Sequence, residues 1–226
     1  DDDADDSDDD DDADDAADDD DDSGAVVEVK LTDIATHWAK KEVEAMVAKG
    51  IIKGHSDGSF KPDNYLNRAE AAILLCRVLG IDETVKAGSN PFKDVMKDSW
   101  FGGCVGELKA LMVVKGNPDG TYKPASNINR AEFLALVIRA YGEMLDEDEK
   151  ADLDAMMAGE AKASFVDVDA KNDWYAGIAY AAKENGFVMG RACGKDNKEK
   201  CFDGGTSITR AEATTVLFRV FDEMLD

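Results

Sequence analysis

Apolar residues follow helical spacing along most of the chain after residue 29. Three helical segments are led by a tryptophan, and each is followed by a polar loop and a second apolar helical segment that begins at residue 68, 130 or 210. Loop residues include Asp-Gly pairs at 57–58 and 119–120, which favour tight turns. The pattern predicts an all-α fold class, mostly helical with long ordered loops.

One four-residue phrase opens all three of the second helical segments. It reads Asn-Arg-Ala-Glu at 67–70 and 129–132, and Thr-Arg-Ala-Glu at 209–212. An Asn or Thr followed three residues later by Glu, ahead of an apolar run, is a capping box. An aromatic stands eight residues before each arginine, namely Phe60, Tyr122 and Phe202. Such self-similarity indicates three internal repeats.

The arginines of this phrase, Arg68, Arg130 and Arg210, stand at the first helical position. A cation there opposes the helix dipole. One interpretation is a salt bridge to a neighbouring acid. The other is a binding site, because free N–H groups at a helix start attract anions and a guanidinium adds a bidentate donor for a carboxylate or phosphate. The repetition favours the second interpretation.

The third repeat departs from the first two in its loop. Six extra residues separate Gly190 from Phe202, and the Lys-Pro pair that follows the aromatic in the other loops is replaced by Asp-Gly. The extra residues contain Cys193 and Cys201, for which we expect a disulfide and an oxidising compartment. Cys76 and Cys104 either pair with each other or are buried thiols. An inserted segment, 146–163, predicts a short amphipathic connector helix ending at Gly159.

The formal charge of −24 comes largely from residues 1–22, which hold 17 Asp. Without them the chain has 33 acidic and 26 basic residues. Residues 1–24 predict a disordered poly-Asp linker or tail; a weak calcium sponge is the alternative. The folded part has no basic face, so we expect no nucleic-acid partner. No apolar run approaches the roughly 18 residues of a membrane span.

Motifs for catalysis are missing from the sequence. It contains no nucleophile elbow, metal triad or phosphate loop, and its two His residues supply little general base. We therefore expect no enzyme, no cofactor and no metal site. The chain begins with Asp rather than Met, which suggests a piece of a longer protein whose cargo lies upstream.

The repeated order is Asp-Val or Asp-Ile, a Trp-led helix, an Asp-Gly loop with an aromatic and Lys-Pro, and then Arg-Ala-Glu opening a second helix. This order resembles the S-layer homology domain, a family usually present as three tandem copies. The resemblance covers about residues 29–226. It divides the chain into repeats at 25–84, 85–145 and 164–226, with the connector at 146–163.

The resemblance implies a pseudo-threefold bundle with three grooves between adjacent repeats. It implies an extracellular module at the bacterial cell surface or S-layer, which anchors exported proteins by binding a secondary cell-wall polymer, typically a pyruvylated polysaccharide. S-layer lattice neighbours are possible further partners. The motif arginines would contact the anionic sugar. Groove aromatics and loop glycines carry over as further ligand-binding residues: Trp38, Trp100, Trp174, Gly54, Gly116 and Gly190.

Several alternatives stay open at this point. The three tryptophans could be core residues, which we favour over ligand stacking because they lie just inside a helix. The altered third loop puts the groove of Arg210 in doubt, so Arg68 and Arg130 are the stronger candidates. The function could instead be peptidoglycan binding, or a cation-dependent structural role in S-layer assembly that uses the poly-Asp tract.

Overall fold

The computed structural model describes residues 31–158 and 164–225. The poly-Asp tract and Gly159 lie outside this part of the chain. The mostly helical fold expected from the sequence is confirmed. Its elements in chain order are α1 (Lys40–Ala48), α2 (Arg68–Val78), α3 (Gly102–Ala110), α4 (Arg130–Gly142), α5 (Glu147–Ala158), α6 (Ala176–Glu184), β1 (Arg191–Cys193), β2 (Glu199–Cys201), α7 (Arg210–Phe221) and the 3-10 helix η1 (Asp222–Met224).

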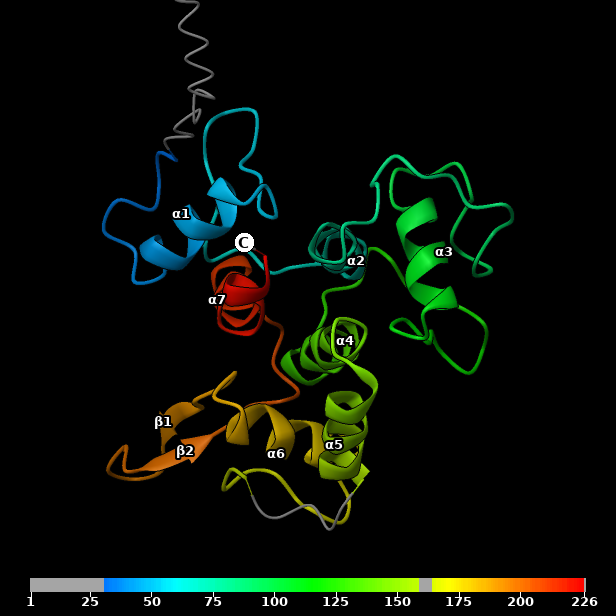
Figure 1. Ribbon diagram of the computed structural model, residues 1–226. Coiled ribbons are helices and arrows are strands. Elements are labelled where there is room, and N and C mark those ends of the chain that lie inside the picture. The colour runs from blue at the N-terminus through cyan, green and yellow to red at the C-terminus, as the bar shows by residue number, and fades with distance from the viewer. Residues whose placement is uncertain (1–30, 159–163, 226) are drawn as a thin grey trace, which may run out of the picture.

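The second helices of the three repeats, α2, α4 and α7, lie together at the centre, and the first helices α1, α3 and α6 lie outside them (Figure 1). Each outer helix packs against the second helix of the preceding repeat: α3 against α2, and α6 against α4. The first repeat completes the cycle, because α1 packs against α7. The three repeats therefore form a closed ring.

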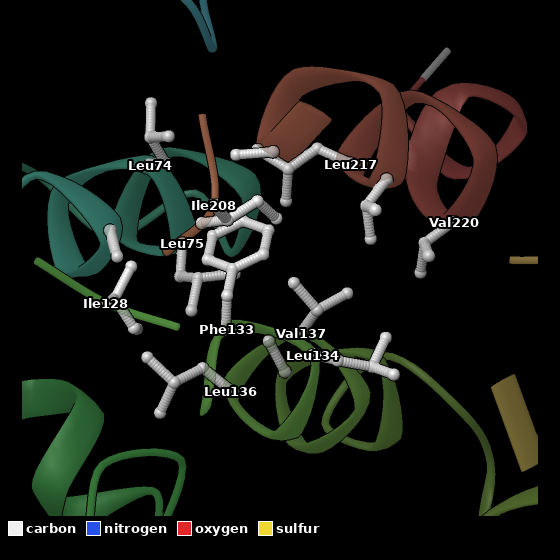
Figure 2. Close-up of a cluster of buried hydrophobic side chains, with 14 of the residues drawn as sticks. Leu74, Leu75, Ile128, Phe133, Leu134, Leu136, Val137, Ile208, Leu217 and Val220 are labelled. Carbon is white, nitrogen blue, oxygen red and sulfur yellow. The ribbon is translucent and has the colours of Figure 1, made fainter. Parts of the chain in front are cut away.

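The hydrophobic core fills the space between the central helices. Figure 2 shows Leu75 of α2, Phe133 and Val137 of α4 and Leu217 of α7 pointing toward one another. Phe133, Leu75, Val137 and Leu217 are fully shielded from solvent. One contiguous cluster joins these side chains to buried residues of α1, α3 and α6, so the repeats share a single core.

The predicted capping boxes are present at all three central helices. The side chain of Asn67 accepts a hydrogen bond from the backbone N–H of Glu70, and the Glu70 carboxylate accepts one from the backbone N–H of Asn67. The same reciprocal pair occurs at α4 and α7. Asp146 and Glu149 cap α5, the predicted connector helix, in the same way.

Backbone hydrogen bonds close the ring where the central helices begin. The N–H of Leu66 donates to the carbonyl of Ile208, that of Ile208 to Ile128, and that of Ile128 to Leu66, each at 3.0 Å. All three side chains are buried. Every repeat is thus tied to both of the others at one point.

The glycines of α3 have a packing role that the sequence analysis missed. Glycine lowers helix propensity, but a Cβ on Gly103 would lie 1.7 Å from the carbonyl oxygen of Val85. A Cβ on Gly177 of α6 would lie 2.0 Å from the carbonyl oxygen of Met157. A side chain at Gly103 would displace the backbone near Val85, and one at Gly177 would displace the C-terminal end of α5.

Two disulfides are present. Cys193 and Cys201 close the hairpin of β1 and β2, with Arg191 facing Cys201 in the antiparallel register. Cys76 of α2 and Cys104 of α3 join the first two repeats. No free cysteine remains in the described chain.

Candidate functional site

The side chain of each motif arginine contacts the loop of the following repeat, and we call each of these contacts between repeats a joint. Arg68 donates from Nε to the backbone oxygen of Tyr122 at 2.7 Å, and its guanidinium lies 4.7 Å from the centre of that ring. Arg130 makes the same contacts with Phe202, at 2.9 and 5.7 Å. Arg210 makes them with Phe60, at 2.8 and 4.8 Å. The arginine of each repeat therefore holds the loop aromatic of the following repeat.

This geometry corrects the pairing assumed from the sequence. The altered loop of the third repeat contacts Arg130, whereas Arg210 contacts the loop of the first repeat. The altered loop therefore bears on the site of Arg130 and not on that of Arg210. The reason is that the loop of a repeat contacts the arginine of the preceding repeat, whereas the arginine of the same repeat contacts the loop of the following one.

The backbone N–H groups at the helix starts are not free, which corrects a second expectation. Those of Arg68, Ala69 and Glu70 donate to Ser126 O, Pro124 O and the Asn67 side chain. The corresponding groups of α4 and α7 are used in the same way. An anion in this region can bind the guanidinium but not the helix terminus.

The salt bridge that the repetition argued against is nevertheless present at two joints. Arg68 lies 3.4 Å from Glu132, and Arg130 lies 3.5 Å from Glu212. These glutamates also complete the capping boxes of α4 and α7. The side chains of Arg68 and Arg130 are only 12% and 10% exposed. The arginines are therefore first of all residues of the joints between repeats.

The tryptophans are exposed, so the expectation that they are core residues is wrong. Trp38, Trp100 and Trp174 have 62%, 63% and 62% of their surface accessible to solvent. Each precedes its helix by two residues, because α1 begins at Lys40, α3 at Gly102 and α6 at Ala176. Helical periodicity does not distinguish this position from a buried one. Three equivalent exposed indoles are a recurring feature that packing does not explain.

One pocket is lined by one of the predicted tryptophans, one of the predicted arginines and one of the predicted loop glycines. It has a volume of about 300 Å³ and is lined by Trp38, Arg130 and Gly190, which come from three different repeats. Side chains of α7, which packs against α1, form one wall. The pocket therefore exists only because the ring is closed.

The pocket is strongly cationic although the chain is acidic. Its lining contains one carboxylate, Glu212, and four cationic side chains: Arg130, Arg191, Lys200 and Arg219. Burial lowers the pKa of Arg130, and the nearby charge of Arg191 lowers it further. Burial raises the pKa of Glu212, but hydrogen bonds from Thr209 and Arg191 outweigh burial, and the net shift is downward. The pocket accordingly favours an additional anion.

The loop glycines have close neighbours of their own. A Cβ on Gly54, Gly116 or Gly190 would lie 2.6, 2.3 or 2.6 Å from the side chain of Leu31, Phe92 or Phe165. Gly116 and Gly190 also have positive φ values, 69° and 70°, which disfavour a side chain. These glycines let the loop pack on the segment that begins its repeat.

The aromatic loops share one backbone geometry, including the third, in which it was expected to differ. Asp33 accepts hydrogen bonds from the N–H groups of Phe60 and Lys61. Asp94 and Asp167 hold their loops in the same way. Asp203 has a φ of 56°, matching 57° at Lys61 and 56° at Lys123. The altered loop thus keeps the backbone conformation of the other two loops at this point, despite its inserted hairpin and its Asp-Gly pair.

Three cationic residues of the pocket were missed from the sequence, namely Arg191, Lys200 and Arg219. Arg219 stands nine residues after Arg210, and Arg77 and Arg139 stand nine residues after the other motif arginines. This spacing could have been found by aligning the repeats. Arg191 follows Gly190 where the other repeats have His55 and Asn117, so the same alignment would have shown a cation unique to the third repeat.

Other candidate sites are weaker. Asp167, Cys201 and Asp203 cluster at metal-ligand distance, but Cys201 is in a disulfide and Asp167 accepts two backbone hydrogen bonds. Within the described residues, the helices are too short or too polar to cross a membrane.

Comparison with known proteins identifies the repeats. The S-layer homology domain model matches residues 30–72 and 91–134. The chain is 38% identical over 91 residues to Cell surface glycoprotein 1 of Acetivibrio thermocellus, covering 40% of this chain and 4% of that protein. It is 30% identical over 171 residues to the Cellulosome-anchoring protein of the same species, covering 74% and 34%. It is 32% identical over 105 residues to the Surface layer protein of Brevibacillus choshinensis, covering 46% and 9%.

The class of protein follows from these matches: the chain is an extracellular, cell-surface anchoring module. The first two of its three repeats match the model of the S-layer homology family. It spans no more than about a third of the length of these three relatives.

Proposed function

We propose that the chain anchors a larger protein to the cell wall by binding an anionic, pyruvylated secondary cell-wall polysaccharide. One observation carries this proposal: the pocket of about 300 Å³ joins an exposed tryptophan, Trp38, to a cluster of guanidinium groups around Arg130. A sugar ring can pack on the indole while its carboxylate accepts hydrogen bonds from arginine. The module acts without catalysis of its own.

The ring geometry extends this proposal to three sites. Each would take its tryptophan, arginine and glycine from three different repeats, as in the described pocket. A second site would then hold Trp100, Arg210 and Gly54, and a third would hold Trp174, Arg68 and Gly116. In support, Arg210 donates to the backbone oxygen of Lys53, the residue before Gly54, at 3.3 Å. Three sites on one polymer would add avidity.

The test is a pull-down with cell-wall sacculi from the source organism, before and after chemical removal of the secondary polymer. We expect binding to intact walls and loss of most binding to stripped walls. Equal binding to stripped walls would contradict the proposal and point to peptidoglycan or a wall protein. Removing residues 1–24 should leave wall binding intact; loss of binding would favour a cation-dependent assembly role for the poly-Asp tract.

Tryptophan variants test the site more cleanly than arginine variants, because the arginines also hold the repeats together. Replacing Trp38, Trp100 and Trp174 together by Ala should reduce wall binding at least tenfold without lowering stability, since the indoles are exposed. Tyr65→Ala is the matched control: Tyr65 is 55% exposed and does not line the pocket. Its wall binding should equal that of the unmodified chain.

A further inference from the structure

The hairpin of the third repeat brings an additional arginine into the pocket. Arg191 is the first residue of β1 and directly follows Gly190. Both residues line the pocket with Trp38 and Arg130. The Cys193–Cys201 disulfide closes the hairpin two residues beyond Arg191. Arg191 is therefore part of a short hairpin that is closed by a covalent bond.

Arg191 and Arg130 converge on one carboxylate. Arg191 donates from one terminal nitrogen to Oε1 of Glu212, and its other terminal nitrogen lies 3.5 Å from Asp203. A terminal nitrogen of Arg130 lies 3.5 Å from the same Glu212 oxygen. At the joint between the first two repeats, Arg68 faces the equivalent glutamate, Glu132, and the loop position of Arg191 is taken by Asn117. The pocket thus has one further guanidinium, that of Arg191, which the repeat pattern does not supply.

The guanidinium of Arg191 keeps donors for a ligand. A guanidinium has five N–H donors, and the contacts of Arg191 with Glu212 and Asp203 involve its two terminal nitrogens. Its side chain is 39% exposed, so a ligand can reach the remaining N–H groups. Asp203 and Glu212 also orient the side chain before any ligand arrives, which reduces the entropy lost on binding.

We propose that Arg191 is a specificity-determining residue: it makes the Trp38–Arg130 pocket the tightest of the three sites for an acidic sugar. The ligand class is a saccharide that carries a carboxylate, and the inference rests on the proposed function. The carboxylate would accept hydrogen bonds from Arg191 as well as Arg130. The disulfide of the hairpin holds Arg191 in position at the pocket.

The experiment measures ligand binding at each of the three sites separately. The chain has three tryptophans, so a ¹H–¹⁵N spectrum gives three indole N–H signals, assigned through single Trp→Phe variants. The probe is a soluble disaccharide with a ketal-linked pyruvate, and its methyl ester is the uncharged control. Each indole then reports a dissociation constant for its own site. We expect the tightest value at Trp38, and much weaker binding of the ester there.

Arg191→Ala should raise the dissociation constant reported by Trp38 about tenfold, as expected for the loss of one charge-assisted hydrogen bond. The values at Trp100 and Trp174 should not change. Lys198→Ala is the matched control, because it removes a cation from the same hairpin: Lys198 is 83% exposed and does not line the pocket. Replacing Cys193 and Cys201 together by Ser should give a smaller rise, at Trp38 alone.

The outcomes separate the inference from the proposed function. An unchanged value at Trp38 in Arg191→Ala would overturn the role of Arg191 and leave the three-site proposal standing. A rise at all three tryptophans would show a general loss of structure and would also overturn it. If no indole signal of the unmodified chain responds to the pyruvylated probe, the proposed function fails and the inference fails with it.

Discussion

At the scale of the residue, the motif arginine joins two functions in one side chain. In Arg130, the Nε atom donates to the backbone of the following repeat, and the side chain also lines the pocket. The aromatic beneath Arg68 is equally constrained. Tyr122 is fully buried, and its hydroxyl donates to the backbone oxygen of Arg68 at 2.8 Å. Ionisation of the buried Tyr122 hydroxyl should therefore weaken this contact between the first two repeats.

Tyr122 predicts a loss of stability at alkaline pH. Burial raises its pKa to about 12, opposed by the charge of Arg68, whereas an unfolded tyrosine titrates near 10. Because the folded pKa is the higher one, the contribution of Tyr122 is fully present below pH 10 and is lost as the pH rises toward 12. The linkage relation gives a loss of about 1.4 kcal/mol by pH 11.

Urea unfolding of the unmodified chain and of Tyr122→Phe at pH 8 and pH 11 measures this loss. The variant should be less stable at pH 8 by about 1 kcal/mol, the usual contribution of one hydrogen bond, and should show a smaller decrease between the two pH values. Comparing the two proteins cancels the titration of lysines. An identical decrease in both would show that folding does not raise the pKa of Tyr122.

The sequence predicted the local part of each joint and missed its partners. A capping box joins residues three apart, so Asn67 and Glu70 identify it without further information. The partner of Arg68 lies 54 residues away, and only the packing of whole helices selects it. Exposure of Trp38 was mispredicted for a related reason: an apolar residue at a helix start satisfies the helical period whichever way it faces.

At the scale of the element, the disulfides stabilise different parts of the fold. Cys76–Cys104 links α2 to α3 and so spans two repeats, with a separation of 28 residues. Cys193–Cys201 closes a hairpin within one repeat, with a separation of 8 residues. The sequence suggested the second pair through its position around an insertion. It left the first pair open because two apolar helix positions do not reveal that α3 packs on α2.

The loop-entropy relation predicts unequal effects of removing the two bridges. Replacing Cys76 and Cys104 by Ser should lower the free energy of unfolding by about 3.5 kcal/mol, and replacing Cys193 and Cys201 by about 2.5 kcal/mol. The first pair is fully buried, so its loss also leaves poorer packing. Thermal unfolding of both variants measures the difference. A larger effect for the hairpin pair would show that the hairpin supports more of the fold than its own repeat.

At the scale of the whole molecule, closure of the ring distinguishes this chain from an open array of repeats. In an open array each repeat contacts only its neighbours in sequence, and the terminal repeats can loosen independently. Here α1 packs against α7, and Arg210 binds the loop of the first repeat, 150 residues away. The described pocket uses the same junction, because Trp38 belongs to the first repeat and α7 to the third.

Closure predicts that breaking any one joint destabilises all of them. Arg68→Ala breaks the joint between the first two repeats, and Arg210→Ala breaks the joint that closes the ring. Each should lower the global free energy of unfolding by about 2–4 kcal/mol, because a shielded, hydrogen-bonded guanidinium is removed and a backbone oxygen loses its partner. Arg219→Ala, at an exposed position of α7, should stay within about 0.5 kcal/mol of the unmodified chain.

Urea unfolding followed by circular dichroism, together with native-state hydrogen exchange, separates a ring from an array. In a ring, both joint variants unfold in one transition, and exchange accelerates by the same factor in α2, α4 and α7. In an array, Arg210→Ala would accelerate exchange only in the terminal elements α1 and α7 and would leave α4 protected. The second result would also remove the physical basis of the described pocket, since its walls would then come from parts of the chain that separate without global unfolding.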